Sequence, residues 1–376
     1  MASTGRPSRA KPRTVKPRTV KPRTVKPRTA LLGAGIAVAL ALIAIFPLVV
    51  TNQLDTQFAV LTLMFVAAVA GWNLFSGYSG YISLGHAVFF GVGAYTVALV
   101  TEHQHLNGGQ IFALIPLGAV VAALFAVPVG LIALRVRRHT FVVITIAVFF
   151  IFQLMAYNLG FTGGSNGIST PFFSWSPATY NNPFYYVAFI LAVGAVLLGW
   201  AIRGSRFGLQ LLAIRDDEDR ARGLGVRTWL VKLTAFMISA AVVGAVGGLW
   251  FIFIGQALPE TAFSPVFDLS VALMAFLGGF GTIAGPVLGA LILEPLQQYV
   301  SIQFTNGYIG EVFLGLLFLA VILLLPRGIV PTSSERITAL RARRERRGQP
   351  PPGIGVPAVA QPQAAGATET STGSVR

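Results

Sequence analysis

The chain of 376 residues is 54% apolar and only 11% charged, whereas about 25% of the residues in an ordinary soluble domain are charged. Apolar stretches close to the length that crosses a bilayer recur from residue 30 to residue 326, which excludes a water-soluble enzyme. The chain contains no cysteine, so disulfides, zinc–thiolate sites, iron–sulfur clusters and thiol nucleophiles are excluded as well.

The net charge of +15 has a distribution that is typical of membrane proteins. All but one of the 28 Lys and Arg residues fall within residues 1–29, 135–138, 203–232 and 327–347. Basic residues collect in the cytoplasmic segments of membrane proteins. The clusters therefore predict four segments on the cytoplasmic side and place both termini there.

The N-terminal segment carries a five-residue repeat, KPRTV, from residue 11 to residue 29. A proline in every repeat opposes a helix, and the repeat has too little apolar surface to fold. We expect residues 1–29 to form a disordered tail that orients the chain and is weakly attracted to anionic lipid. No aromatic residue interleaves with its cations, so nucleic-acid binding is not expected. Residues 331–376, basic and then rich in Pro, Ala, Thr and Gly, predict a second disordered cytoplasmic tail.

Between the tails, residues 30–330 predict a membrane domain of about ten helical spans, because backbone polar groups within lipid must be satisfied internally. In chain order, the expected spans are 30–50, 58–75, a segment ending near 100, 111–134, 141–159, 183–202, 230–255, 268–283, 285–302 and 309–326. The expected outer loops carry no Lys or Arg and are 51–57, 101–110, 160–182, 256–267 and 303–308. As an alternative, one of the two short segments, 268–283 or 285–302, is a re-entrant segment rather than a complete span. The fold class is thus an all-α polytopic membrane protein with some broken or re-entrant segments.

A patch rich in Gly and Ser interrupts the apolar sequence between residues 71 and 87. Its candidate site residues are Asn73, Gly77, Gly80, Ser83, Gly85 and His86. Polar, flexible backbone at membrane depth occurs where it lines a water-filled path or is packed in protein, and small residues let helices approach closely. Both interpretations stay open. The other histidines are not at ligand spacing with His86, so we expect this residue to be packed and hydrogen-bonded rather than to bind a metal.

A second glycine-rich patch places Gly281, Gly285 and Gly289 four residues apart. This spacing favours a smooth face for helix packing, with contact to a substrate as the alternative. Glu294 follows within an apolar run. An ionisable group there is expected to face a cavity or a partner, unless it lies near a helix end within reach of water.

The basic loop at 203–229 predicts one short amphipathic helix on the cytoplasmic side. Its apolar positions recur loosely at helical spacing, and Gly223 and Gly225 provide a stop. Such a helix is either a docking element for a soluble partner or part of a solvated loop. The acidic run 216–219 is not expected to bind a metal, because adjacent carboxylates on a helix point in different directions.

Three blocks of sequence resemble the LivM-type permease of branched-chain amino acid ABC transporters. They are, in family order, GWNLFSGYSGYISLGHAVFFGVGAYTVALV, GLQLLAIRDDEDRARGLGVRTWLVKLTAFMISAAVVGAVGGLW and LMAFLGGFGTIAGPVLGALIL. With the spans between them they cover about residues 30–330, and both tails lie outside the resemblance. The resemblance implies a permease domain in the cell inner membrane, a LivH-like second permease, two cytoplasmic ATP-binding subunits and an extracytoplasmic substrate-binding protein.

The resemblance also implies roles for the candidate residues. The segment 208–225 corresponds to the cytoplasmic element that couples to the ATPase; the candidates there are Gly208, Ala213, Arg215, Asp216, Gly223 and Gly225. The patch from Asn73 to His86 would line or shape the substrate path. No Gly-Lys dipeptide occurs, so the chain has no P-loop; ATP is expected on the partner subunits, with no cofactor and no enzyme activity in this chain. The alternatives are a permease for urea or short-chain amides and a membrane scaffold that transports nothing.

Overall fold

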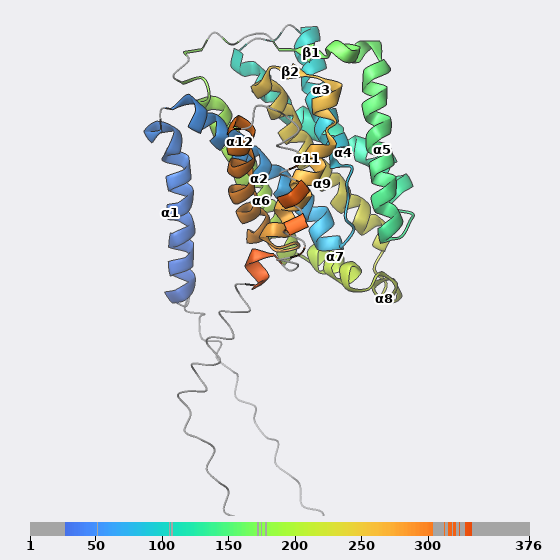
Figure 1. The fold of residues 1–376 in the computed structure, drawn as a ribbon. Coiled ribbons are helices and arrows are strands. Elements are labelled where there is room, and N and C mark those ends of the chain that lie inside the picture. The colour runs from blue at the N-terminus through green and yellow to red at the C-terminus, as the bar shows by residue number, and fades with distance from the viewer. Residues whose placement is uncertain are drawn as a thin grey trace, which may run out of the picture.

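The computed structural model describes residues 27–50, 52–104, 106, 108–170, 173, 175–176, 179–303 and 328–332, and a few positions between 312 and 323. These residues form a bundle that is almost entirely helical (Figure 1). The predicted tails, the last predicted span at 309–326 and the outer loop at 303–308 lie wholly or largely outside the described residues.

The helices of the described segments follow the predicted spans closely. In chain order they are α1 (Pro27–Val49), α2 (Gln53–Ser79), α3 (His86–Gln104), α4 (Ile115–Ala133), α5 (Arg138–Asn158), α6 (Asn182–Gly204), α7 (Arg206–Asp216), α8 (Glu218–Gly223), α9 (Thr228–Ile254), α10 (Pro259–Ala262), α11 (Pro265–Gly278) and α12 (Ala284–Gln303). Short 3₁₀ turns occur at Gly108–Leu114, Gly160–Thr162 and Gly164–Asn166. The first helix begins at Pro27 rather than at residue 30, because proline is tolerated in the first turn of a helix.

Six helical stretches in the described part of the chain are long and apolar enough to cross a membrane. They are Gln53–Ser79, Gly108–Ala133, Arg138–Asn158, Asn182–Gly204, Thr228–Ile254 and Pro259–Gly278. The helices α3 and α12, of 19 and 20 residues, complete the bundle. The predicted class, an all-α polytopic membrane protein, is confirmed, whereas the count of ten spans stays a prediction.

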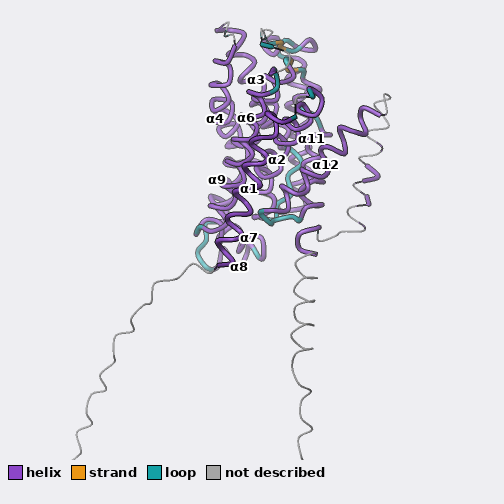
Figure 2. The backbone as a smooth tube through the Cα atoms, turned by 90° about the vertical axis from the view of Figure 1, so that its left-hand side faces the viewer, coloured by secondary structure: helices purple, strands orange, loops and turns teal. Residues whose placement is uncertain are grey.

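The bundle has two distinct ends (Figures 1 and 2). At one end lie α7 and α8, where the guanidinium of Arg138 donates to the carbonyl oxygens of Ile214 and Arg215 at 2.8 and 2.6 Å. At the other end, β1 (Ile168–Ser169) pairs antiparallel with β2 (Gln256–Ala257). The predicted cytoplasmic loops at 135–138 and 203–229 therefore meet at one end of the bundle. The predicted outer loops at 160–182 and 256–267 meet at the other end.

Glycines bring α3, α4 and α9 into close contact at the centre of the bundle. A Cβ at Gly93 would lie 2.0 Å from the carbonyl oxygen of Gly244, and a Cβ at Gly247 would lie equally close to the carbonyl oxygen of Phe90. Small residues allow such backbone approach between helices within a membrane. This interface fixes α3 against α9 and so holds the site described below.

We expect Gly93→Val to destabilise the protein by about 3 kcal/mol or more, because the obstructing atom belongs to the backbone and cannot turn away. The readout is the thermal unfolding midpoint and the monodisperse yield in detergent. The control is Gly194→Val on α6, where a Cβ meets nothing within 4 Å. Equal behaviour of the two variants would contradict the close approach.

Candidate functional site

The break between α2 and α3 lies at the same end of the bundle as α7 and α8. Helix α2 ends where Gly80 adopts a left-handed conformation (φ 74°) and donates its N–H to the carbonyl oxygen of Ser76. Residues 80–85 then lead without regular structure into α3. The predicted broken segment is thus confirmed, although α2 continues to Ser79 before it breaks.

The polar residues of this break are buried and mutually satisfied. His86 is fully buried, with Nδ1 3.0 Å from the Ser83 hydroxyl and Nε2 2.7 Å from the Ser239 hydroxyl. Ser239 donates its own proton to the Gly71 carbonyl oxygen, so it accepts from His86 Nε2–H, and Ser83 donates to Nδ1. His86 is therefore packed and hydrogen-bonded, as expected. Among the described residues, no group of His, Asp and Glu could hold a metal ion.

Asn73 joins α2 to the turn between α11 and α12. Its side-chain amide donates to the Thr282 carbonyl oxygen at 2.8 Å, and its carbonyl oxygen accepts the Gly281 N–H at 2.9 Å. Gly77 permits the contact, since a Cβ there would lie 3.1 Å from the Gly281 Cα. A Cβ at Gly85 would lie 2.6 Å from the Thr145 carbonyl oxygen of α5. In this conformation the patch packs helices together.

The predicted glycine face at 281–289 needs one correction. Gly281 lies in the turn before α12, with a φ of 76°, and therefore does not share a helix face with the other two glycines. Gly285 and Gly289 do pack α12 against α11, since a Cβ at Gly289 would lie 1.8 Å from the Met274 carbonyl oxygen. The sequence spacing could not reveal that the helix begins only at Ala284.

The loop at 203–229 forms two short helices where the sequence predicted one. Ser205 caps α7 by accepting the Gly208 N–H, and Asp217, in an extended conformation, caps α8 by accepting the Asp219 and Arg220 N–H groups. Asp217 thereby divides the predicted helix, because an N-cap residue has non-helical backbone angles.

The other candidate residues of this loop differ in exposure. Gly208 lies tightly against the end of α6, because a Cβ there would be 2.1 Å from the Ile202 carbonyl oxygen. Ala213 is half-buried, whereas Asp216, Gly223 and Gly225 are exposed at the surface. Gly225 has a φ of 87°, which favours glycine in the turn that leads into α9.

Arg215 connects α7 to the membrane helices. Its guanidinium donates to the Gly77 carbonyl oxygen near the end of α2 at 2.9 Å and lies 5.2 Å from the centre of the Phe280 ring. Its own carbonyl oxygen accepts from Arg138 at the start of α5. A neighbouring cation, Arg203, donates to the Gly281 carbonyl oxygen at 2.5 Å. Arg215 and its neighbours thus connect α7 to α2, α5 and the α11–α12 turn.

A buried ion pair connects α8 to α9 and to the helix break. Lys232 Nζ lies 2.8 Å from a carboxylate oxygen of Glu218 and donates to the Tyr81 hydroxyl at 3.2 Å; Tyr81 in turn donates to Glu218. Burial of the Glu218 carboxylate opposes its ionisation. The hydrogen bonds from Lys232 and Tyr81 and the charges of Lys232 and Arg222 outweigh burial and hold the pKa of Glu218 below its ordinary value. Residues 81, 218 and 232 meet only in the folded chain, so their spacing in the sequence does not reveal this network.

A polar cleft of about 590 Å³ opens beside this ion pair. It is lined by the 135–139 loop, the acidic run 216–219 and the start of α9 at Thr228 and Trp229. Leu224, 85% exposed, projects from the loop that follows α8. The charged cleft and the exposed Leu224 therefore both lie at the α7–α8 end of the bundle.

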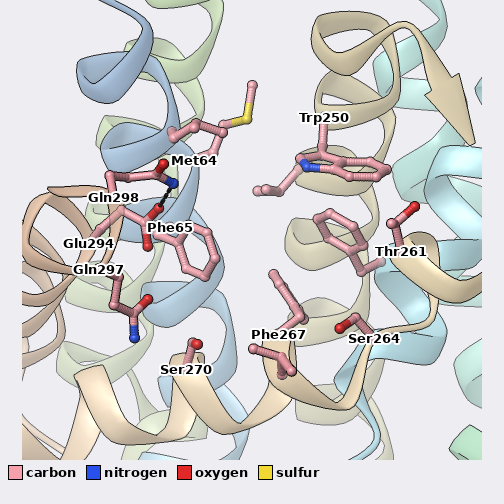
Figure 3. Close-up of a pocket in the computed structure, with 14 residues that line it drawn as sticks. Met64, Phe65, Trp250, Thr261, Ser264, Phe267, Ser270, Glu294, Gln297 and Gln298 are labelled. Atoms are coloured by element: carbon pink, nitrogen blue, oxygen red, sulfur yellow. Dashed lines mark hydrogen bonds between the residues drawn. The ribbon is translucent and has the colours of Figure 1, made fainter. Parts of the chain in front are cut away.

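A second cavity lies near the other end of the bundle, between α2, α3, α9, α11 and α12, and holds about 230 Å³ (Figure 3). Glu294 lies in its wall with 1% of its surface exposed; one carboxylate oxygen accepts from Gln298 at 2.8 Å, and the other has no partner among the described residues. Glu294 is thus buried in the wall of a cavity and has Gln298 as its partner, which agrees with the expectation of a cavity or a partner.

Asp268 is a second buried carboxylate, which sequence reasoning did not single out. Its Oδ1 accepts the Ala87 N–H at 3.0 Å at the start of α3, and its Oδ2 has no partner within the described part of the chain. An acidic side chain stabilises the N-terminus of a helix. The sequence signal that could have identified Asp268 is the presence of an aspartate within the predicted span 268–283.

Comparisons with known proteins agree with this architecture. The family model described as branched-chain amino acid transport system / permease component matches residues 54–322. The high-affinity branched-chain amino acid transport system permease proteins LivM of Salmonella typhimurium and Escherichia coli K12 are each 29% identical, over 80% of this chain and 75% of theirs. The LivH permease protein of the same system in Salmonella typhimurium is 26% identical over 69% of this chain and 89% of its own. No solved structure matches. The chain belongs to the family of permease components of branched-chain amino acid transport systems.

Proposed function

We propose that this chain is a membrane-spanning permease subunit of an ABC importer for leucine, isoleucine and valine. The observation that carries the proposal is the family match over most of the described helices. The chain supplies a translocation route, and no covalent chemistry occurs in it. It lacks a P-loop, so the ATP that drives transport binds to other subunits.

The proposed assembly pairs the chain with a LivH-like permease, two cytoplasmic ATP-binding subunits and an extracytoplasmic substrate-binding protein. The relationship to both LivM and LivH proteins supports the paired permeases. The polar cleft and exposed Leu224 support α7–α8 as the site at which an ATP-binding subunit docks.

The proposed topology has about ten spans in the cell inner membrane, within residues 30–330, and both termini in the cytoplasm. The charge distribution supports it, since the Arg-rich segments at 135–138 and 203–227 lie at one end of the bundle. The tails at 1–29 and 331–376 are proposed to be disordered and cytoplasmic.

The proposed mechanism is alternating access. Closure of the ATP-binding subunits moves α7 and α8, and the contacts of Arg215 and Glu218 transmit that movement to α2, α5, α9 and the α11–α12 turn. The break at 80–85 and the close contacts of Asn73 and Gly77 are where the helices shift, opening a path beside the patch. The proposed substrate path thereby passes Asn73 and Gly77, which are packed against the α11–α12 turn in the present conformation.

The test is uptake of radiolabelled leucine into proteoliposomes that contain the complete transporter, ATP and the cognate binding protein. We expect ATP-dependent accumulation of leucine, competed by isoleucine and valine and not by urea. Accumulation of urea in place of leucine would favour the amide permease. Absence of any ATP-binding subunit after purification in mild detergent would favour the scaffold.

A further inference from the structure

An apolar groove lies between α1 and the rest of the bundle. Helix α1 stands at the edge of the bundle in Figure 1. It contacts α6, because the Tyr185 hydroxyl donates to the Ile43 carbonyl oxygen at 2.5 Å and the Tyr185 ring stacks on Phe46. Two cavities of about 440 and 180 Å³ lie between α1, α2, α6 and α12, and Ile43, Leu63 and Leu291 line both. The two cavities therefore adjoin, and together they form the α1 groove.

The walls of the α1 groove suit hydrocarbon rather than water. All the residues that line it are apolar except Asp55, Thr62 and Tyr185. The Thr62 hydroxyl is satisfied within its own helix, because it donates to a carbonyl oxygen one turn earlier at 2.7 Å. Leu42 and Leu291, which line the groove, are also exposed on the surface of the bundle. Apolar cavities stay dry, so a groove that opens to the bilayer is filled by an acyl chain.

The length of the α1 groove corresponds to one leaflet of the membrane. Its wall on α2 extends from Asp55 to Val66, which is about 16 Å of helix at about 1.5 Å per residue. The hydrocarbon core of a bilayer is about 30 Å thick. The groove begins near the end of α2 that lies away from α7 and α8, so it reaches about the middle of the membrane. It therefore accommodates an acyl chain of the leaflet at that end, which is the outer leaflet in the proposed topology.

A carboxylate stands at the mouth of the α1 groove. Asp55 lies in the first turn of α2 and is exposed. It forms no ion pair within the part of the chain that the structure describes, and the expected outer loops contain no Lys or Arg. The head group of a lipid in the groove lies beside this negative charge. An ammonium head group is attracted to it, whereas a head group with only a negative charge is repelled.

We propose that the α1 groove binds one phospholipid with a primary ammonium head group. Its acyl chain fills the space between α1, α2, α6 and α12, and its ammonium group pairs with Asp55. The acyl chain gives α1 packing contacts in addition to those with Tyr185. This site is separate from the break at 80–85, and it does not depend on which substrate the transporter carries.

The first test locates the lipid. The complete transporter is placed in vesicles of equal parts phosphatidylethanolamine, phosphatidylcholine and phosphatidylglycerol, and one of the three at a time carries a photoreactive diazirine in its acyl chain. After illumination, mass spectrometry maps the label on this subunit. We expect the phosphatidylethanolamine probe to label residues 55–66 of α2 severalfold more than the apolar face of α4 and α5 around Leu124 and Phe150, which is exposed. Equal labelling of the two faces would indicate bulk lipid only and would overturn the site. An unlabelled groove would show that protein covers it and would overturn the site as well.

The second test fills the groove. Ala59→Phe places a ring in the wall of the larger cavity, and Ala147→Phe makes the same change at an exposed position on α5. We expect severalfold less label on residues 55–66 in Ala59→Phe and wild-type labelling in Ala147→Phe. Wild-type labelling in Ala59→Phe would contradict occupation of the groove by an acyl chain.

The third test concerns the head group and leaves the groove unaltered, so it also applies if Ala59→Phe fails to fold. Wild-type protein should prefer the phosphatidylethanolamine probe over the phosphatidylglycerol probe by roughly threefold, because exposed ion pairs are weak. Asp55→Asn should abolish this preference, whereas Glu102→Gln, which removes an exposed carboxylate at the same end of the bundle, should retain it. A preference that survives in Asp55→Asn, or equal labelling of the wild type by both probes, would overturn the proposed ammonium lipid.

Discussion

Replacement of Arg215 by glutamine is expected to reduce leucine uptake per ATP hydrolysed by roughly 30-fold. The guanidinium donates to the Gly77 carbonyl oxygen and lies over Phe280, so its loss separates α7 from α2 and from the α11–α12 turn. A hydrogen bond from a charged group contributes about 2 kcal/mol, which corresponds to roughly a 30-fold change in an equilibrium. The measurement is the ratio of uptake to hydrolysis in proteoliposomes.

The matched control is Arg206→Gln, which removes an exposed cation from the same helix. We expect this variant to couple uptake to hydrolysis as the wild type does, because Arg206 does not connect α7 to the membrane helices. Loss of hydrolysis together with uptake in Arg215→Gln would indicate failed assembly. Normal coupling in that variant would contradict transmission through Arg215.

Replacement of Lys232 by methionine is expected to destabilise the subunit by about 3 kcal/mol, because it leaves the largely buried carboxylate of Glu218 with only the exposed Arg222 as a cation. The double variant Lys232→Met/Glu218→Gln should recover much of that loss, since no isolated charge remains. The measurement is a double-mutant cycle of thermal unfolding in detergent at neutral pH. Arg227→Met, at the exposed position before α9, is the control and should have little effect.

The same ion pair gives wild-type stability a defined dependence on pH. The folded-state pKa of Glu218 lies below its ordinary value of 4.5. The contribution of Glu218 to stability is therefore fully present above pH 4.5 and is lost as the pH falls through the lower, folded-state pKa. Glu218→Gln should remove this part of the acid sensitivity; acid sensitivity identical to that of the wild type would contradict the assignment.

The sequence predicted the arrangement of the helices well, because hydrophobic length and the placement of cations act locally along the chain. The loops at 135–138 and 203–229, which the charge pattern assigned to the cytoplasmic side, meet in the structure through Arg138. The loops at 160–182 and 256–267, assigned to the outer side, meet through β1 and β2. The break after Ser79 was also predictable, because Gly80 and its neighbours favour non-helical backbone.

The candidate site was predictable only in part. Burial of His86 and the cavity beside Glu294 follow from the cost of placing polar groups among apolar ones. The 203–229 loop divides at Asp217 because the side chain of Asp217 caps α8. The composition of the loop does not reveal this division, because an aspartate is also compatible with a helix interior. The contacts among Tyr81, Glu218 and Lys232 join three separate segments, and nothing in the spacing of a single sequence reveals them.

The most direct test of the account is the side of the membrane on which α7 and α8 lie. Because the chain has no cysteine, Leu224→Cys and Phe161→Cys each introduce one thiol at an exposed position, at opposite ends of the bundle. With a membrane-impermeant maleimide added outside cells whose inner membrane is intact and accessible, we expect Phe161→Cys to react and Leu224→Cys to react only after permeabilisation. Labelling of Leu224→Cys from outside would place α7 and α8 away from cytoplasmic ATP and would contradict the coupling mechanism.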